Sequence, residues 1–511
     1  QLVSHVRRHD YQLPLSKVFE CSDFQSMAAN MSRLTEKSEV EWPDVSRNRV
    51  NPIQRWFLNL RLRHPNHWNQ SNLIHFKKPI QEDILENALA RAFENHVAYN
   101  LRFEEDENGW YQCKQSRFQP PKFQVVEIEL DDSTQNQIKL NELCAEAQST
   151  HDPSVGRTCS TVFFRSKGGT TRSLFISIHH LVMDQISWRI LLEDLDLAYA
   201  QLSRNKPVHL PTEITTPLNW VEALRNYSNH PDFKKETAYW NFCTPPDALM
   251  VMPELENEGD NTEESTETVE VSLASEETHS LASKIHAAYN TEMNDILLAA
   301  LVLCLQKKRQ GETVSFYLEG HGREPIDQPH DLSRTIGWFT TLFPVTIRCE
   351  KSDTESVIKN VKEHLRSIPH HGIGYGLDSC FEPGTKDNKA DRTPEIIFNY
   401  LGQTDRVLNN LEVIDRATPM FHSEKAPTNQ RICSLEVLCW IEQNEFKSHW
   451  FYSRNRHRRE SIEQLAESFL SCLRQIIDHC QSSESGGYTP SDFKTADLTQ
   501  DQLDDILSSF D

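Results

Sequence analysis

Apolar positions in the first half of the chain follow two alternating periodicities. Residues 173–178 alternate with period two, which predicts a buried strand with side chains on both faces. From Trp188 to Leu202 apolar residues recur at helical spacing. The same two patterns predict further helices and strands, at residues 83–100, 101–103, 134–148 and 159–165. Helices that alternate with strands favour an α/β lobe.

This pattern breaks between Trp240 and Val271. Residues 253–270 hold eight carboxylates and no lysine or arginine, which is typical of a solvated connection. Beyond it the periodicity predicts a second set of elements: helices at 275–289 and after Thr291, strands at 314–318 and 395–397, and a closing helix at 461–479. We therefore expect two α/β lobes with their boundary in the acidic stretch.

Composition narrows the class of protein. The 511 residues are too many for one compact core, and the net charge of −22 argues against a nucleic-acid partner. The 12 cysteines are scattered without a Cys-x-x-Cys pair, so we expect reduced thiols in the cytoplasm and no metal site. The longest apolar run, residues 296–305, is half a membrane span, so we expect no membrane association.

Candidate chemistry begins at His179 and His180, where the strand 173–178 has ended and a helix is about to start. Imidazoles at such a junction can face a cleft and act as general acid or base. Two structural alternatives stay open, because the histidine pair also fits a hydrogen-bonded rim and Asp184 also fits a helix N-cap.

A second reactive group, Glu319, follows the predicted strand 314–318 in the phrase Glu319-Gly320-His321-Gly322-Arg323. Glycines on both sides of His321 predict a tight backbone near a ligand or another chain segment. Taken alone, the phrase is also typical of an ordinary polar loop.

Several phrases together resemble the epimerization domains of nonribosomal peptide synthetases, within the condensation superfamily. The histidine motif continues into Ser187-Trp188-Arg189, and the Glu319 phrase resembles a second motif of that family. Further resemblances lie at residues 52–57 with 67–70, 334–340, 369–376 and 398–403. The stretch 334–340 is where condensation and epimerization domains differ, and it resembles the latter. Gln185 departs from the family, which often has glycine after the aspartate.

The resemblance implies two chloramphenicol-acetyltransferase-like lobes in a V-shaped pseudo-dimer, at residues 51–252 and 271–487, joined by the acidic connection 253–270. It implies epimerization, from L to a D/L mixture, at the Cα of an aminoacyl or peptidyl thioester tethered to phosphopantetheine. Lying in different lobes, His180 and Glu319 are the catalytic candidates. The supporting candidates are His179, Asp184, Arg323, Asn399 and Tyr400.

The resemblance also implies what those supporting residues do. Asp184 is expected to be oriented toward an arginine, and His179 to support its loop. Arg323, Asn399 and Tyr400 are candidates to line the site. For Asn399 and Arg323, a structural hydrogen-bond network is an equally good interpretation.

Both ends of the chain resemble connecting parts of a synthetase. Residues 1–34 form a short helical segment that resembles the end of a peptidyl carrier domain, followed by a linker at 35–50. The serine that carries phosphopantetheine is not in this chain, and the residues that bind the pantetheine arm are not indicated. Residues 488–511 resemble a linker to the next module.

The implied partners are the peptidyl carrier domain of the same synthetase and a downstream condensation domain. Two rival functions remain. A condensation domain would use the same histidine motif to form a peptide bond between two carrier-bound substrates, and a nonenzymatic scaffold would only dock carriers.

Overall fold

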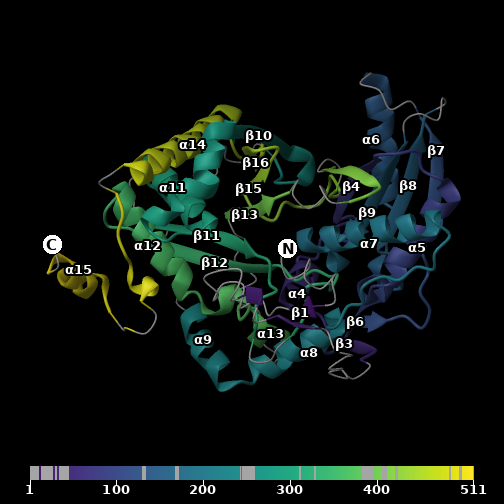
Figure 1. Cartoon of the computed structure of the whole chain (residues 1–511), viewed down its shortest axis with the longest axis horizontal. Helices are drawn as coiled ribbons and strands as arrows, with labels where there is room; N and C mark the ends of the chain where they lie inside the picture. The colour runs from purple at the N-terminus through teal and green to yellow at the C-terminus, as the bar shows by residue number, and fades with distance from the viewer. Residues whose placement is uncertain are drawn as a thin grey trace.

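The computed structural model describes residues 11–12, 27–28, 31–33, 45–128, 134–166, 172–241, 243, 259–309, 312–326, 330–381, 395–404, 411–420, 424–482, 485–493, 496 and 498–509. It has two α/β lobes side by side, which confirms the predicted fold class (Figure 1). Among the helices that the structure describes, none is long and apolar enough to cross a membrane.

The N-terminal lobe is built on a five-stranded sheet of order β14-β4-β9-β8-β7. Its strands are β4 (Asn69–Phe76), β7 (Phe123–Glu127), β8 (Cys159–Arg165), β9 (Arg172–His179) and β14 (Ile414–Pro419). Helices α5 (Glu82–Glu94) and α7 (Gln185–Ser203) pack on the face that buries Leu174, Ile176 and Ile178. Helix α6 (Thr134–Gln148) covers the other face, where Phe175 is buried. Residues 173–178 therefore have buried side chains on both faces, as predicted.

Smaller elements complete this lobe. A three-stranded sheet has the order β3-β6-β5, formed by β3 (Arg47–Arg49), β6 (Gly109–Lys114) and β5 (Leu101–Asp106). Helix α4 (Pro52–Asn59) follows β3. Helices α8 (Pro217–Ser228) and α9 (Pro231–Asn241) run along the lower edge of the molecule toward the second lobe (Figure 1).

The C-terminal lobe contains a six-stranded sheet of order β10-β16-β15-β13-β11-β12. Its strands are β10 (Thr266–Leu273), β11 (Thr313–Gly320), β12 (Thr341–Arg348), β13 (Ile396–Gln403), β15 (Leu435–Glu442) and β16 (Glu445–Ser453). Helices α11 (Met293–Arg309), α12 (Thr354–Ser367) and α14 (Arg459–Gln481) cover one face (Figure 1). Phe316 and Leu318 of β11 are buried under them. Strand alternation therefore turns Tyr317 and Glu319 to the opposite face, toward the N-terminal lobe.

Strand β14 crosses from the second half of the sequence into the sheet of the first lobe. It pairs antiparallel with β4, with Thr418 opposite Leu73. Ile336 and Trp338 are likewise buried in the core of the N-terminal lobe. These segments of the predicted range 271–487 therefore pack their side chains against the N-terminal lobe.

Two predicted connections contain strands. β3 lies inside the predicted linker 35–50, and β10 begins at Thr266, inside the predicted connection 253–270. Residues 253–258 of that connection lie outside the described residues. β10 is an edge strand in which Val269 is buried and Glu270 is exposed, whereas Glu267 accepts from the hydroxyl of the buried Tyr452 at 2.7 Å. Beyond β10 the predicted helix 275–289 is a helical stretch in three parts: α10 (Ser275–His279), the π-helix η5 (Ser280–Lys284) and the 3-10 helix η6 (His286–Ala288).

The terminal segments are only partly described. Most of the helical unit predicted at residues 1–34 lies outside the described residues, and β1 (Tyr11–Gln12) and β2 (Ser32–Arg33) pair antiparallel within it. At the other end, the buried Lys362 ammonium donates to both carboxylate oxygens of Asp492, at 2.7 and 2.8 Å. This ion pair ties residues 485–493 to α12, and helix α15 (Gln500–Ser508) follows.

Candidate active site

The histidine motif occupies the junction between β9 and α7. The strand ends at His179, one turn spans His180–Val182, and α7 begins at Gln185. His179 accepts from the Leu181 backbone N–H at Nδ1 (3.2 Å) and donates from Nε2 to the Pro65 carbonyl (2.8 Å). Burial lowers the pKa of His179 to about 3. His179 is therefore a neutral side chain that bridges the turn and the Pro65 carbonyl.

Gln185, which departs from the family pattern, is exposed at the first position of α7. Its φ is not positive, so the position does not require a glycine backbone.

His180 lies half-buried at the start of this turn, between residues from distant parts of the chain. Its ring lies against the indole of Trp338, with centroids 4.2 Å apart. Its Nε2 is 3.0 Å from Nε2 of Gln70 on β4. Burial, with a smaller contribution from Lys425, lowers the pKa of His180 to about 4, although Asp184 opposes the shift. The imidazole is therefore neutral near pH 7 and has the protonation state of a base.

Glu319 lies at the end of β11, on the sheet face opposite to the helices. Asn399 of the neighbouring parallel strand β13 donates from Nδ2 to Glu319 Oε2 at 2.6 Å. Burial raises the pKa of Glu319 to about 8, and Glu436 raises it further while Lys425 opposes. This carboxyl group therefore carries a proton near pH 7 and has the protonation state of an acid.

Lys425 acts electrostatically on both of these groups. Its ammonium lies 4.7 Å from the centroid of the Trp68 ring and 3.5 Å from Glu436 Oε2. Burial lowers the pKa of Lys425, but the neighbouring carboxylates outweigh this and raise it above its ordinary value. The resulting positive charge lowers the pKa of both His180 and Glu319. The base from one lobe and the acid from the other thus share one charged neighbour.

Asp184 and Arg323 form an ion pair that holds the histidine motif against the second lobe. Arg323 Nη2 is 3.0 Å from each carboxylate oxygen of Asp184, and the two side chains are only 7% and 4% exposed. Asp184 also caps α7 by accepting from the Ser187 N–H at 2.8 Å, and it accepts from the Phe339 N–H at 3.2 Å. Arg323 donates further to two backbone carbonyls. Both residues thus belong to one hydrogen-bond network, and Asp184 is the N-cap of α7.

Tyr400 is not brought together with Glu319. The sequence predicted that the strand ends at Ile397, whereas β13 continues to Gln403. Because Asn399 faces Glu319, strand alternation turns Tyr400 to the other side, where it is partly buried against the core under the helices.

Gly322 accounts for the tight backbone expected beside His321. Its φ is +63°, and a Cβ placed there would lie 1.7 Å from the Phe339 carbonyl oxygen. The close approach is therefore to another chain segment.

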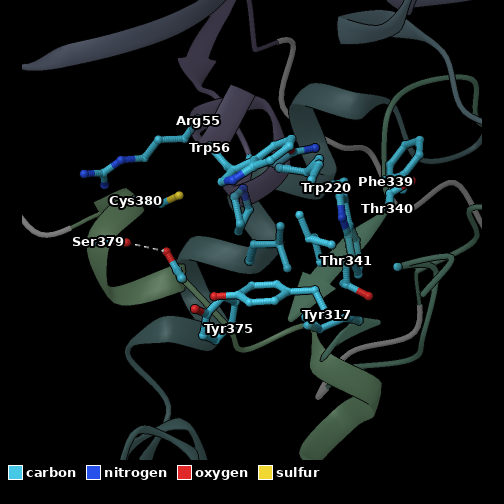
Figure 2. Close-up of a pocket in the computed structure, with 18 residues that line it drawn as sticks. Arg55, Trp56, Trp220, Tyr317, Phe339, Thr340, Thr341, Tyr375, Ser379 and Cys380 are labelled. Carbon is cyan, nitrogen blue, oxygen red and sulfur yellow. Dashed lines mark hydrogen bonds between the residues drawn. The ribbon is translucent and has the colours of Figure 1, made fainter. Parts of the chain in front are cut away.

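A pocket opens between the lobes, and the space between its walls, including the part open to solvent, is about 840 Å³ (Figure 2). Helices α4 and α8 line one side, and β11, the start of β12 and the turns around α13 (Leu377–Phe381) line the other. Aromatic and hydroxyl side chains dominate the lining, among them Trp56, Trp220, Tyr317, Phe339, Thr341 and Tyr375. Tyr317 precedes Glu319 by two residues on the same strand face, so the pocket adjoins the reactive carboxyl group. Neither Glu319 nor His180 lines it directly.

Sequence reasoning missed Gln70, Lys425 and Glu436, which contact or act on the reactive pair. Gln70 lies in the stretch 67–70, which resembles a family motif. Its position in that motif was the only signal that pointed to a role in the site. Lys425 and Glu436 belong to no motif and meet the site only through the fold. Over the described part of the chain, no cluster of three or more His, Cys, Asp or Glu side chains is arranged to hold a metal ion.

Known sequences resemble this chain along its whole length. A family model described as Condensation domain matches residues 47–499. The chain is 34% identical over 519 residues to a polypeptide of the linear gramicidin synthase of Brevibacillus parabrevis, and 31% identical over 515 residues to surfactin synthase subunit 1 of Bacillus subtilis (strain 168). These matches cover 99% and 100% of this chain but only 7% and 14% of the two synthases. The chain therefore spans a small part of the length of these relatives.

Solved structures share the fold. The epimerization domain from the third module of tyrocidine synthetase B superposes with a TM-score of 0.76 at 30% identity, covering 85% of this chain and 98% of that one. The first condensation domain of the calcium-dependent antibiotic synthetase, in complex with a substrate analogue, gives 0.64 at 14% identity, covering 86% and 98%. The predicted two chloramphenicol-acetyltransferase-like lobes are confirmed by these likenesses. The matched family model and the 30% identity together place this chain in the condensation-domain family.

Proposed function

We propose that this chain epimerizes the Cα of an aminoacyl or peptidyl residue held as a thioester on the phosphopantetheine of a peptidyl carrier domain. The observation that carries the proposal is that opposite lobes supply His180, whose pKa burial lowers, and Glu319, whose pKa burial raises, and that Lys425 acts on both. The 30% identity to an epimerization domain supports it.

Inversion needs a proton removed from one face of Cα and another delivered to the opposite face. In the resting protonation state His180 accepts the first proton and Glu319 supplies the second. The enolate formed between these steps carries negative charge, which the Lys425 ammonium would favour and the Glu436 carboxylate would oppose. After one turnover His180 is protonated and Glu319 is ionised, so the two groups must exchange protons with solvent or react in reverse.

The alternative within the family is a condensation domain, which would use the same histidine with a second carrier-bound substrate. The buried acid at Glu319 favours epimerization, because a peptide-bond-forming reaction has no need for a proton donor opposite the base.

The two reactions differ in the number of carrier-bound substrates that they require. The L-aminoacyl thioester on its carrier, supplied alone, should give a D/L mixture on chiral analysis of the released amino acid. Product seen only as a peptide bond, after a second loaded carrier is added, would favour condensation.

The pH dependence of the reaction should follow the two perturbed groups. His180 must be deprotonated, so kcat/KM should rise as the pH passes about 4. Glu319 must be protonated, so kcat/KM should fall as the pH passes about 8. We expect a bell-shaped profile for both the L- and the D-thioester, measured as the initial rate of inversion. Activity that keeps rising above pH 9 would contradict a protonated Glu319 as the donor.

The pocket between the lobes is proposed to receive part of the tethered substrate. A neutral, hydrogen-bonding arm suits its aromatic and hydroxyl lining, and the pocket lies beside Glu319. The carrier domain of the same synthetase is then the partner that presents the thioester, and a downstream condensation domain is the partner that uses the product.

Filling this pocket should impair tethered substrates. Thr340→Trp places an indole in the lining and should lower kcat/KM for the carrier-bound thioester at least tenfold, equivalent to about 1.4 kcal/mol. Val125→Trp adds the same side chain at a site on β7 that is 40% exposed, and it should leave kcat/KM unchanged. Equal values of kcat/KM in the two variants would show that the tethered substrate does not occupy this pocket.

A further inference from the structure

The amide of Gln70 is held between two side chains that fix which way it is turned. Its Oε1 is 3.0 Å from Trp188 Nε1, and its Nε2 is 3.0 Å from His180 Nε2. An indole N–H can only donate, so the atom that faces Trp188 is the amide oxygen. The NH₂ group therefore faces His180, and the ring nitrogen opposite it must accept.

This arrangement selects one form of the His180 ring. With Nε2 accepting, the single ring proton of the neutral imidazole sits on Nδ1. Within the described part of the chain, Nδ1 is buried and makes no hydrogen bond of good geometry. The backbone of His180 and Met183 nevertheless raises the pKa of the ring, in opposition to the larger effect of burial. A proton on Nε2 would instead direct an N–H at the amide NH₂ of Gln70. The contact thus opposes the imidazolium form.

We propose that Gln70, oriented by Trp188, is the positioning residue that keeps His180 neutral with its lone pair on Nε2. The inference rests on the proposed function and identifies Nε2 as the atom that accepts the Cα proton. Trp188 suits the orienting role because it is 4% exposed on the first turn of α7, where packing fixes its indole. Because Nε2 has one lone pair, the Gln70 amide must leave this contact before Nε2 takes up the substrate proton, and the N–H then formed would oppose the return of the amide N–H.

Two charged groups act on His180 besides this contact. Asp184 favours the protonated ring and Lys425 opposes it. Both belong to elements other than β4, and both stay in place when Gln70 is changed. A change in the titration of His180 caused by substituting Gln70 therefore reports the amide contact itself.

The decisive substitution is Gln70→Glu, because a carboxylate accepts from both Trp188 Nε1 and a protonated His180 Nε2. We expect His180 to titrate about one to three pH units higher than in the wild-type protein, the range typical of a new carboxylate partner. The measurement is ring ¹⁵N NMR of histidine-labelled protein, with the His180 signals identified by their loss in His180→Ala. Gln124→Glu makes the same charge change on the exposed strand β7 and should cause no shift. An unshifted His180 titration in Gln70→Glu would overturn the proposal.

A second variant tests the tautomer without introducing charge. Gln70→Met keeps the length of the side chain but removes the donor to Nε2, so the His180 ring should become a mixture of both neutral tautomers in the same spectra. A ring that stays protonated only at Nδ1 would show that Gln70 does not select the tautomer.

Activity provides the link to catalysis. In Gln70→Glu, the acidic limb of the kcat/KM profile should move upward by the same amount as the NMR titration. A limb that stays in place while the titration moves would show that Nε2 is not the proton acceptor, which overturns that part of the inference. The His180 titration could shift in Gln70→Glu while the wild-type enzyme shows no inversion of the thioester. That result would refute the proposed function but would leave the control of His180 protonation by Gln70 intact.

Discussion

Glu319→Gln and His180→Ala should each slow inversion of a carrier-bound aminoacyl thioester by about 10²- to 10⁴-fold, the range typical of a lost general acid or base. Glutamine keeps the shape of Glu319 and can still accept from Asn399, so the loss would reflect the missing proton rather than disturbed packing. The rate of inversion is measured by chiral analysis of the released amino acid.

Deuterium incorporation from solvent distinguishes the two roles. Each variant is supplied separately with the L- and the D-thioester, and exchange at Cα is followed by mass spectrometry. Because the two groups face opposite sides of Cα in this mechanism, any residual exchange should favour opposite enantiomers in the two variants. Glu324→Gln is the matched control, since Glu324 directly follows that phrase but pairs with the exposed His321 at 3.0 Å. Near-normal inversion in Glu319→Gln or His180→Ala would exclude that residue as an obligatory proton carrier.

Asp184→Ala should lower the free energy of unfolding by about 3–5 kcal/mol, as expected when one partner of a buried ion pair is removed. The substitution leaves the Arg323 guanidinium buried without its anion, and it also removes the N-cap of α7 and the acceptor for the Phe339 N–H. Urea unfolding, followed by circular dichroism, measures the change.

Two further variants separate charge from packing at this position. Asp184→Asn keeps an oxygen for the cap and for Arg323, so its loss should be smaller than that of Asp184→Ala. Glu94→Ala removes the exposed partner of Arg91, where both side chains are 57% exposed, and should change stability by less than about 1 kcal/mol. Equal urea midpoints for Asp184→Ala and Glu94→Ala would mean that the ion pair between Asp184 and Arg323 does not stabilise the contact between the lobes.

Local patterns in the sequence predicted the elements that bear the site. The strand 159–165 and the helix 134–148 have the bounds found for β8 and α6. The position of His180 between a strand and a helix follows from the same periodicity. The acid and the base were proposed from family phrases, and the structure adds the perturbed pKa of each.

Other features depend on the tertiary fold and leave no local signal. β14 is mostly exposed at the edge of a sheet, so its residues show no clear alternation of apolar and polar side chains. The contact of Asn399 with Glu319 spans 80 residues and depends on the register of β13 beside β11. Lys425 reaches the site only because Trp68 and Glu436, from different lobes, pack around it.

The passage of β14 into the N-terminal sheet has a consequence for how such proteins can be divided or recombined. An N-terminal lobe cut away at the acidic stretch would lose the neighbour of β4 and present that strand as an open edge, a template for pairing with other chains. The lobes are thus distinct in architecture but not separable as folding units. Exchange of parts between related synthetases should therefore keep residues 411–420 with the lobe whose sheet they complete.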